Sequence, residues 1–120
     1  MNQEIKAKWV AALRSGEYRQ AKETLRATES EGVHAYCCLG VLCDLYAKEK
    51  GIPFSKNDFC SDEEEELPNA TISEWAGFDE INDPSVEIRG EKRCLSTHND
   101  GGNTVSKSFS EIADAIEAQL

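Results

Sequence analysis

The sequence predicts an α+β fold: a mainly helical single domain of four to five helices with one short β-hairpin. Apolar residues recur at helical spacing in several segments, and glycine and proline separate these segments. Val86 to Ile88 instead alternates in the manner of a strand, and after a turn at Gly90 the chain can pair back over residues 93–95. The chain has 120 residues, which is enough for one domain, 1–120, and too few for two ordinary ones.

The chain is expected to begin with a helical hairpin. Asn2 to Leu13 places its apolar residues on one helical face, and Gly16 follows as a helix stop. Glu17 to Thr28 carries a second apolar stripe that includes Tyr18, so the sequence predicts a second helix there. Glu29 to Gly32 is expected to be a polar break.

The next helix is predicted over Cys37 to Lys50, with Gly51 at its end and Pro53 preventing its continuation. Gly40 lies inside this helix and costs up to ~1 kcal/mol relative to alanine. A close approach by another element would explain a glycine at this position, because only glycine leaves that room. We therefore expect a neighbouring segment to contact the helix at Gly40.

The cysteines are expected to be reduced thiols, and the block Tyr36–Cys43, which holds three of them, is expected to be packed core. Their number is odd and no export signal is visible, which disfavours a disulfide framework. Their spacing lacks the paired C-x2-C ligands of zinc sites. Most stand among apolar residues, which favours packing over catalysis. The five are Cys37, Cys38, Cys43, Cys60 and Cys94.

Four elements are expected in the second half of the chain. Pro68 to Ala76 predicts a short helix, and residues 86–95 predict the β-hairpin. Thr97 to Ser106 is expected to be a polar loop in which His98 is exposed. Ser108 to Glu111 forms a capping-box pattern ahead of an apolar stripe, which predicts the C-terminal helix.

The charge balance restricts the class of partner. A net charge of -10 disfavours nucleic acid and anionic membrane. No apolar run approaches the ~20 residues of a membrane span. Together with the missing export signal, this predicts a cytoplasmic protein. Half of the net charge lies in Asp62–Glu66, within a segment, 57–66, that is expected to be an acidic, mobile loop.

No motif of an enzyme or a cofactor is visible. The chain has no glycine-rich phosphate loop, no G-x-S-x-G and no H-E-x-x-H. We expect no cofactor and no metal, and the sequence favours a binding protein over an enzyme. An acid–base pair cannot be chosen from the many carboxylates without their geometry.

Several blocks resemble a family of small tailed-phage and prophage accessory proteins. They follow one another in the family's order over most of the chain. The blocks are Lys8–Gln20, the CCLGVLCDL segment Cys37–Leu45, Leu67–Pro68 with Glu74–Gly77, Asn99–Gly101, and Phe109–Glu117. Two features depart from the pattern: segment 57–66 looks like an insertion, and His98 stands where the family has an apolar residue. The resemblance implies a viral origin and the bacterial host cytoplasm.

Small phage proteins of this kind commonly bind host molecules. The leading hypothesis is counter-defence by sequestration of a nucleotide-derived signalling molecule, such as a cyclic ADP-ribose isomer or a cyclic oligonucleotide. The pocket could lie within one chain or at the interface of a homo-oligomer. The candidate ligand-binding residues are Arg14, Tyr18, Arg89, Asn99 and Asp100.

The arginines would bind phosphate, and the Asn99–Asp100 pair would bind ribose or base edges. Tyr18 could stack on a base. A structural interpretation stands beside two of these roles: Tyr18 suits the core, and Asn99–Asp100 suits a turn. Two alternative functions remain open. One is an acidic protein–protein inhibitor or DNA mimic that targets a basic host protein, and the other, ranked last, is a small nucleotide-acting enzyme.

Overall fold

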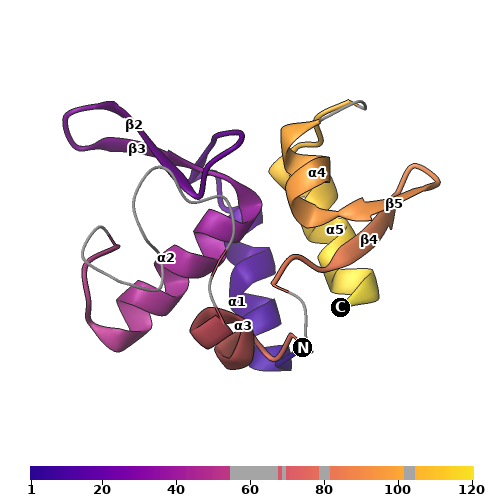
Figure 1. Ribbon diagram of the computed structural model, residues 1–120, viewed down its shortest axis with the longest axis horizontal. Helices are drawn as coiled ribbons and strands as arrows, with labels where there is room; N and C mark the ends of the chain where they lie inside the picture. Colours follow the sequence, from indigo (N-terminus) through magenta and orange to yellow (C-terminus); the bar gives the residue numbers. More distant parts are fainter. Residues whose placement is uncertain (55–67, 69, 79–81, 102–104) are drawn as a thin grey trace.

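The computed structural model describes residues 1–54, 68, 70–78, 82–101 and 105–120, and these form five helices and two small sheets (Figure 1). The α+β class and the number of helices are as predicted. The acidic segment 57–66 lies outside the described residues. The elements, in order, are α1 (Gln3–Arg14), β1 (Arg19–Gln20), β2 (Arg26–Ser30), β3 (Val33–Tyr36), α2 (Cys38–Lys50), α3 (Ala70–Ala76), β4 (Ser85–Ile88), β5 (Glu91–Cys94), α4 (Leu95–Asp100) and α5 (Phe109–Gln119).

A three-stranded sheet in the order β1-β3-β2 replaces the helix that was predicted over residues 17–28. β1 runs parallel to β3, and β2 pairs with β3 antiparallel. Glu23 has φ 63°, a left-handed conformation that a right-handed helix cannot contain. Gly32, at φ 76°, turns the chain from β2 to β3. The prediction of a helix was therefore wrong, and the polar break is a hairpin turn.

The predicted β-hairpin is confirmed as β4 and β5, which pair antiparallel with Val86 opposite Arg93. Arg89 and Gly90 form its turn, and both have positive φ, 55° and 81°. Two such residues match the twist of the flanking strands. In Figure 1 this hairpin lies on the same side of the molecule as α4 and α5, whereas the first sheet lies beside α2.

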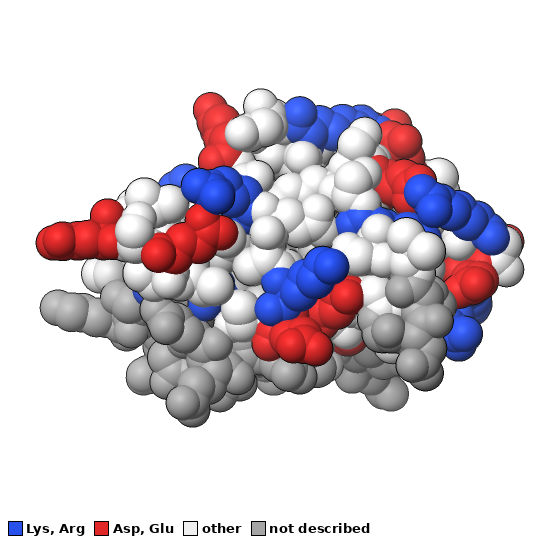
Figure 2. Space-filling view, turned by 90° about the horizontal axis from the view of Figure 1, so that it is seen from above, with Lys and Arg blue, Asp and Glu red and all other residues white. Residues whose placement is uncertain are grey.

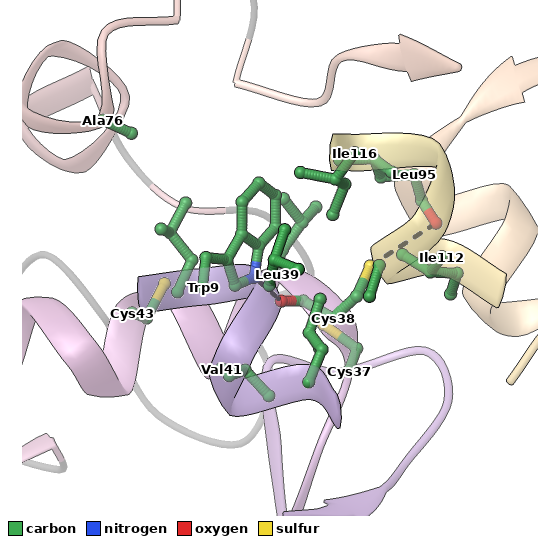
Figure 3. Close-up of a cluster of buried hydrophobic side chains, with 14 of the residues drawn as sticks. Trp9, Cys37, Cys38, Leu39, Val41, Cys43, Ala76, Leu95, Ile112 and Ile116 are labelled. Carbon is green, nitrogen blue, oxygen red and sulfur yellow. Dashed lines mark hydrogen bonds between the residues drawn. The ribbon is translucent and has the colours of Figure 1, made fainter. Parts of the chain in front are cut away.

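The predicted core block is confirmed. The apolar side chains from Cys37 to Cys43 are at most 3% exposed and Gly40 is buried, whereas Tyr36 is half-buried. Trp9 from α1 is buried against the block (Figure 3). The indole Nε1 of Trp9 donates to the carbonyl oxygen of Cys38 at 2.9 Å. The Cys38 thiol in turn donates to the carbonyl oxygen of Leu95 at 3.7 Å, so α1, α2 and α4 meet at one point.

The expected close approach at Gly40 is confirmed. A Cβ at this position would lie 1.8 Å from the carbonyl oxygen of Leu25. Leu25 is fully buried and precedes β2. Glycine is therefore required because the backbone before β2 passes directly over α2.

Side-chain caps explain where the helices begin. The Asn2 side chain accepts from the backbone N–H of Glu4 and Ile5 at the start of α1. Ser108 Oγ accepts from the N–H of Glu111 at 3.2 Å, which confirms the predicted start of α5. The carboxylate of Glu111, however, binds Arg89, so the contact expected of a capping-box glutamate is replaced by a tertiary one.

The polar loop predicted over Thr97 to Ser106 was wrong at its beginning. Residues Leu95–Asp100 form α4, and His98 is fully buried instead of exposed. The Asp83 carboxylate accepts from both the N–H and the hydroxyl of Ser96, which stabilises the first turn. The imidazole Nε2 of His98 contacts the carbonyl oxygen of Val86 at 2.8 Å. Because a carbonyl only accepts, this nitrogen carries the proton.

Candidate functional site

The five sequence-predicted ligand residues are held by different elements. Arg14 ends α1 and binds two carboxylates of α5: Nη2 lies 2.6 Å from Asp114 Oδ1, and Nη1 lies 2.9 Å from Glu117 Oε2. Arg89, in the β4–β5 turn, donates from Nε and Nη2 to Glu111 Oε1 at 3.0 and 2.5 Å. Both arginines therefore connect other elements to α5.

Asn99 is fully buried and uses its whole amide. Its Oδ1 accepts from the N–H of Cys38 at 3.1 Å and from Gln20 Nε2 at 2.9 Å. Its Nδ2 donates to the carbonyl oxygen of Ala21 at 2.7 Å and to Asp100 Oδ1 at 2.9 Å. No hydrogen-bonding capacity remains for a ligand, so the structure gives Asn99 a structural role at the junction of β1, α2 and α4.

Asp100 supports the same junction. Its Oδ1 also accepts from the N–H of Glu23 at 2.9 Å. Glu23 has the left-handed conformation and precedes β2. The side chains of the Asn99–Asp100 pair thus bind backbone and side-chain groups of residues 20–23, together with Cys38.

Tyr18 belongs to a different assembly, in which three aromatic rings adjoin one another and a cation lies at each end. Its ring packs edge-on against Tyr36 with centroids 5.1 Å apart, and Tyr36 packs edge-on against Phe54 at 5.8 Å. The guanidinium carbon of Arg26 lies 4.6 Å from the Phe54 centroid, and Lys48 Nζ lies 5.3 Å from that of Tyr18. We name Arg26, Phe54, Tyr36, Tyr18 and Lys48, in this spatial order, the aromatic–basic row.

The strand register places part of this row on one face of the first sheet. Arg26 is paired with Tyr36, and Thr28 with His34. Because side chains alternate along a strand, these four share a face. Thr28 Oγ1 lies 3.2 Å from His34 Nδ1. Arg26, Tyr36 and His34 are half-buried, so solvent reaches part of each.

Asp44 bonds both side chains at the Tyr18 end of the row. It is buried, and its Oδ2 accepts from the Tyr18 hydroxyl at 2.5 Å and pairs with Lys48 Nζ at 2.9 Å. Burial first, and then the bond to Asp44, raise the pKa of Tyr18 to about 12, although Lys48 opposes part of this effect. Burial likewise raises the pKa of Tyr36. Both phenols therefore stay neutral at neutral pH.

The Arg26 end of the row has unused donor capacity. Arg26 Nε is buried without a hydrogen-bond partner among the residues that the structure describes. A buried donor without a partner is costly, so an anionic group that bonds the Arg26 guanidinium would offset part of this cost.

The surface charge near the first sheet is mixed. Eight of the 23 acidic residues and one of the 13 basic residues lie outside the described part of the chain, which therefore carries a net charge of -3 out of -10. On the face seen from above in Figure 1, the end that carries β2 and β3, basic and acidic side chains surround an uncharged area (Figure 2). No continuous acidic patch covers the coloured part of this face.

Two buried thiols beside Asn99 are not activated. Burial raises the pKa of Cys37 to about 12, although the N–H of Gly40 donates to its sulfur at 3.3 Å. Burial also raises the pKa of Cys38. Both thiols stay protonated at neutral pH, so neither supplies a thiolate. Across the described ranges, no three His, Cys, Asp or Glu side chains are grouped to bind a metal.

Sequence reasoning identified Tyr18 but missed the other four residues of the row. The sequence predicts a helix at Arg26 and places Tyr36 in the packed core block just before the next helix. The alternation in Val33–Tyr36 directly after Gly32 is the signal that could have revealed the strand. It spans four residues, and its partner strand contains little apolar sequence.

Comparison with known proteins yields a family match. The model of a family described as a domain of unknown function (DUF8296) matches residues 1–120. Searches of curated proteins and of solved structures give no match. None of the helices in the described ranges has both the length and the apolar character to cross a membrane.

Proposed function

Because this chain belongs over residues 1–120 to the DUF8296 family, a domain of unknown function, we propose its function from its geometry: it binds a nucleotide-derived signalling molecule and sequesters it unchanged. The observation that carries this proposal is the aromatic–basic row, in which three adjoining rings have a cation at each end. Nucleotides combine ring systems with phosphates, and proteins bind them through aromatic and basic side chains together.

The two ends of the row favour a ligand with more than one anionic group. Arg26 offers a planar fork that binds phosphate in a bidentate manner. Lys48, whose side chain is 68% exposed, places its ammonium at the other end, where it also pairs with Asp44. A cyclic oligonucleotide or a cyclic ADP-ribose isomer carries phosphates for the two cations and a base ring for the aromatic side chains.

The electrostatics of the row support an anionic ligand despite the negative chain. Both tyrosines are neutral phenols, because burial raises their pKa. Among the residues that the structure describes, the row has two cations, and the carboxylate that contacts it, Asp44, is already bonded to Tyr18 and Lys48. Local charge of this kind decides binding at short range more than the net charge does.

Sequestration is favoured over conversion by the state of the nearby reactive groups. The Asp44 carboxylate next to the row is occupied by two partners. The Cys37 and Cys38 thiols remain protonated, because burial raises their pKa. The resemblance of the chain to phage accessory proteins adds the setting: counteraction of host defence in the bacterial cytoplasm.

A DNA mimic or acidic inhibitor has less support. It would need exposed, regularly spaced carboxylates. Glu111, Asp114 and Glu117 of α5 are spaced at three-residue intervals, but Arg14 and Arg89 bind all three. Two guanidinium groups thus neutralise two of the three carboxylates, so no continuous row of unpaired negative charge remains on α5 for a basic partner.

Capture and release tests the proposal. The purified protein is titrated calorimetrically with cyclic di-AMP, cyclic di-GMP and cyclic ADP-ribose, and a bound ligand is recovered by heat denaturation and identified by mass spectrometry. We expect binding of at least one compound and its release intact. Release of an altered compound would indicate an enzyme. Absence of binding to all three, with a host protein recovered by pull-down, would favour the acidic inhibitor.

A further inference from the structure

A groove of about 390 Å³ runs along α1 beside the end of α5. Its floor is formed by Ala7, Val10 and Ala11, on one side of the helix. Lys6 lies toward one end of the groove, and Arg14 lies with Glu117 of α5 at the other. The groove shares no residue with the aromatic–basic row, so its role is independent of the proposed ligand site.

We propose that this groove is the contact surface for a second copy of the chain, with α1 packed antiparallel against α1 of the partner. Ala7 and Ala11 are exposed and one turn apart, and they present only methyl groups. Small residues allow two helices to approach closely. The side chains of the partner's α1 then fill the groove.

The charges at the two ends of the groove indicate the partner. Lys6 is half-buried and forms no ion pair with any residue that the structure describes, so its end is positive. At the other end two carboxylates, Asp114 and Glu117, share the single guanidinium of Arg14, so that end is negative. Lys6 and Arg14 are eight residues apart, or about 12 Å along the helix.

A surface with opposite charges at its ends is complementary to itself. In a two-fold contact the same patch meets its own copy in reverse, so residue i contacts j and j contacts i. Antiparallel pairing brings each Lys6 toward the partner's Glu117 and satisfies both ends at once. A partner of one charge sign would match only one end.

The test is the mass of the protein in solution. Sedimentation velocity over a concentration series is expected to show a monomer–dimer equilibrium for the wild-type chain. Lys6→Glu is expected to weaken dimerisation by about tenfold or more, because it places like charges in contact. The double variant Lys6→Glu/Glu117→Lys restores opposite charges across the interface and is expected to recover the dimer.

Lys92→Glu is the matched control. It makes the same charge change at an exposed position of β5, away from the groove residues, and should leave dimerisation unchanged. Ala11→Glu, also at an exposed position, obstructs the floor and provides a second variant if Lys6→Glu does not fold. A wild-type chain that is monomeric at every concentration would overturn the proposal. So would an oligomer that Lys6→Glu and Ala11→Glu weaken no more than Lys92→Glu does.

Discussion

At the scale of single residues, Gly40 sets the distance between α2 and the backbone before β2. A Cβ there would lie 1.8 Å from the carbonyl oxygen of Leu25. Because the contact is with backbone, α2 or the segment at Leu25 would have to move to relieve it. We expect Gly40→Ala to lower the free energy of unfolding by about 3 kcal/mol, as overpacking does in tight cores. Urea denaturation measures this change.

Gly51 provides the control for this substitution. It has φ 69° and open space around its Cβ position, so Gly51→Ala should cost only about 1 kcal/mol of backbone strain. If Gly40→Ala costs no more than Gly51→Ala, the close approach of Leu25 does not exist in solution.

Tyr18 makes a prediction about alkaline pH. Its pKa is raised from 10.0 to about 12, chiefly by burial and then by the bond to Asp44. Folding therefore favours the protonated phenol. This contribution to stability is complete below pH 10.0 and is lost as the pH rises through about 12. In Tyr18→Phe the free energy of unfolding, measured by urea denaturation, should fall less over this pH interval than in the wild-type protein. An unchanged pH profile would contradict the assigned contact.

The cysteines are expected to differ in reactivity. Cys37 and Cys38 are buried, and their pKa is raised by that burial, whereas Cys94 is half-exposed. Thiolate is the reactive species, so iodoacetamide should modify Cys94 of the native protein well before the other two. Peptide mass spectrometry measures each rate. Equal rates at Cys38 and Cys94 would mean that the core is open.

At the scale of elements, Asn99 holds the junction of β1, α2 and α4 with four hydrogen bonds. Asn99→Ala leaves the N–H of Cys38 and the carbonyl oxygen of Ala21 buried without this partner, at a cost of about 3 kcal/mol or more. Asn82, which donates one bond to the carbonyl oxygen of Pro68, is the control, and Asn82→Ala should cost about 1 kcal/mol. Similar urea midpoints for the two variants would contradict the role of the junction.

The elements with local signals could be predicted. Asn2 and Ser108 cap α1 and α5 as their sequences indicate, and Gly51 ends α2 in the left-handed conformation. The first sheet could not be predicted in this way, because β1 pairs with β3 across sixteen residues and its strands are short. The six-residue α4 depends on Asp83, which caps it from outside the helix.

At the scale of the whole molecule, the arrangement of charge could be predicted only in part. The sequence shows a net charge of -10 but not where the opposite charges meet. Arg14 and Arg89 attract attention as phosphate ligands, yet each is bound to carboxylates of α5 about 100 and 22 positions away in the chain. Arg26, Tyr36 and Lys48 come together with Tyr18 only through the sheet and α2.

The fold thus places the row of rings and cations where the sequence shows only separate residues. We expect Arg26, and not the arginines bound to α5, to contact the anionic group of the ligand. Arg14→Gln and Arg89→Gln should therefore leave ligand affinity unchanged, because both guanidinium groups are already held by carboxylates. Arg93→Gln is the control, because it also removes one positive charge but lies at an exposed position of β5, outside the row.

The most direct measurement is the calorimetric affinity of Arg26→Gln for whichever of the three cyclic nucleotides the wild-type protein binds, beside that of Arg93→Gln. We predict that Arg26→Gln, with an unchanged circular dichroism spectrum, binds about tenfold or more weakly, which is the loss of one charge-assisted contact. Arg93→Gln should bind as the wild-type protein does. Equal affinities for the two variants would contradict the assignment of the aromatic–basic row as the ligand site.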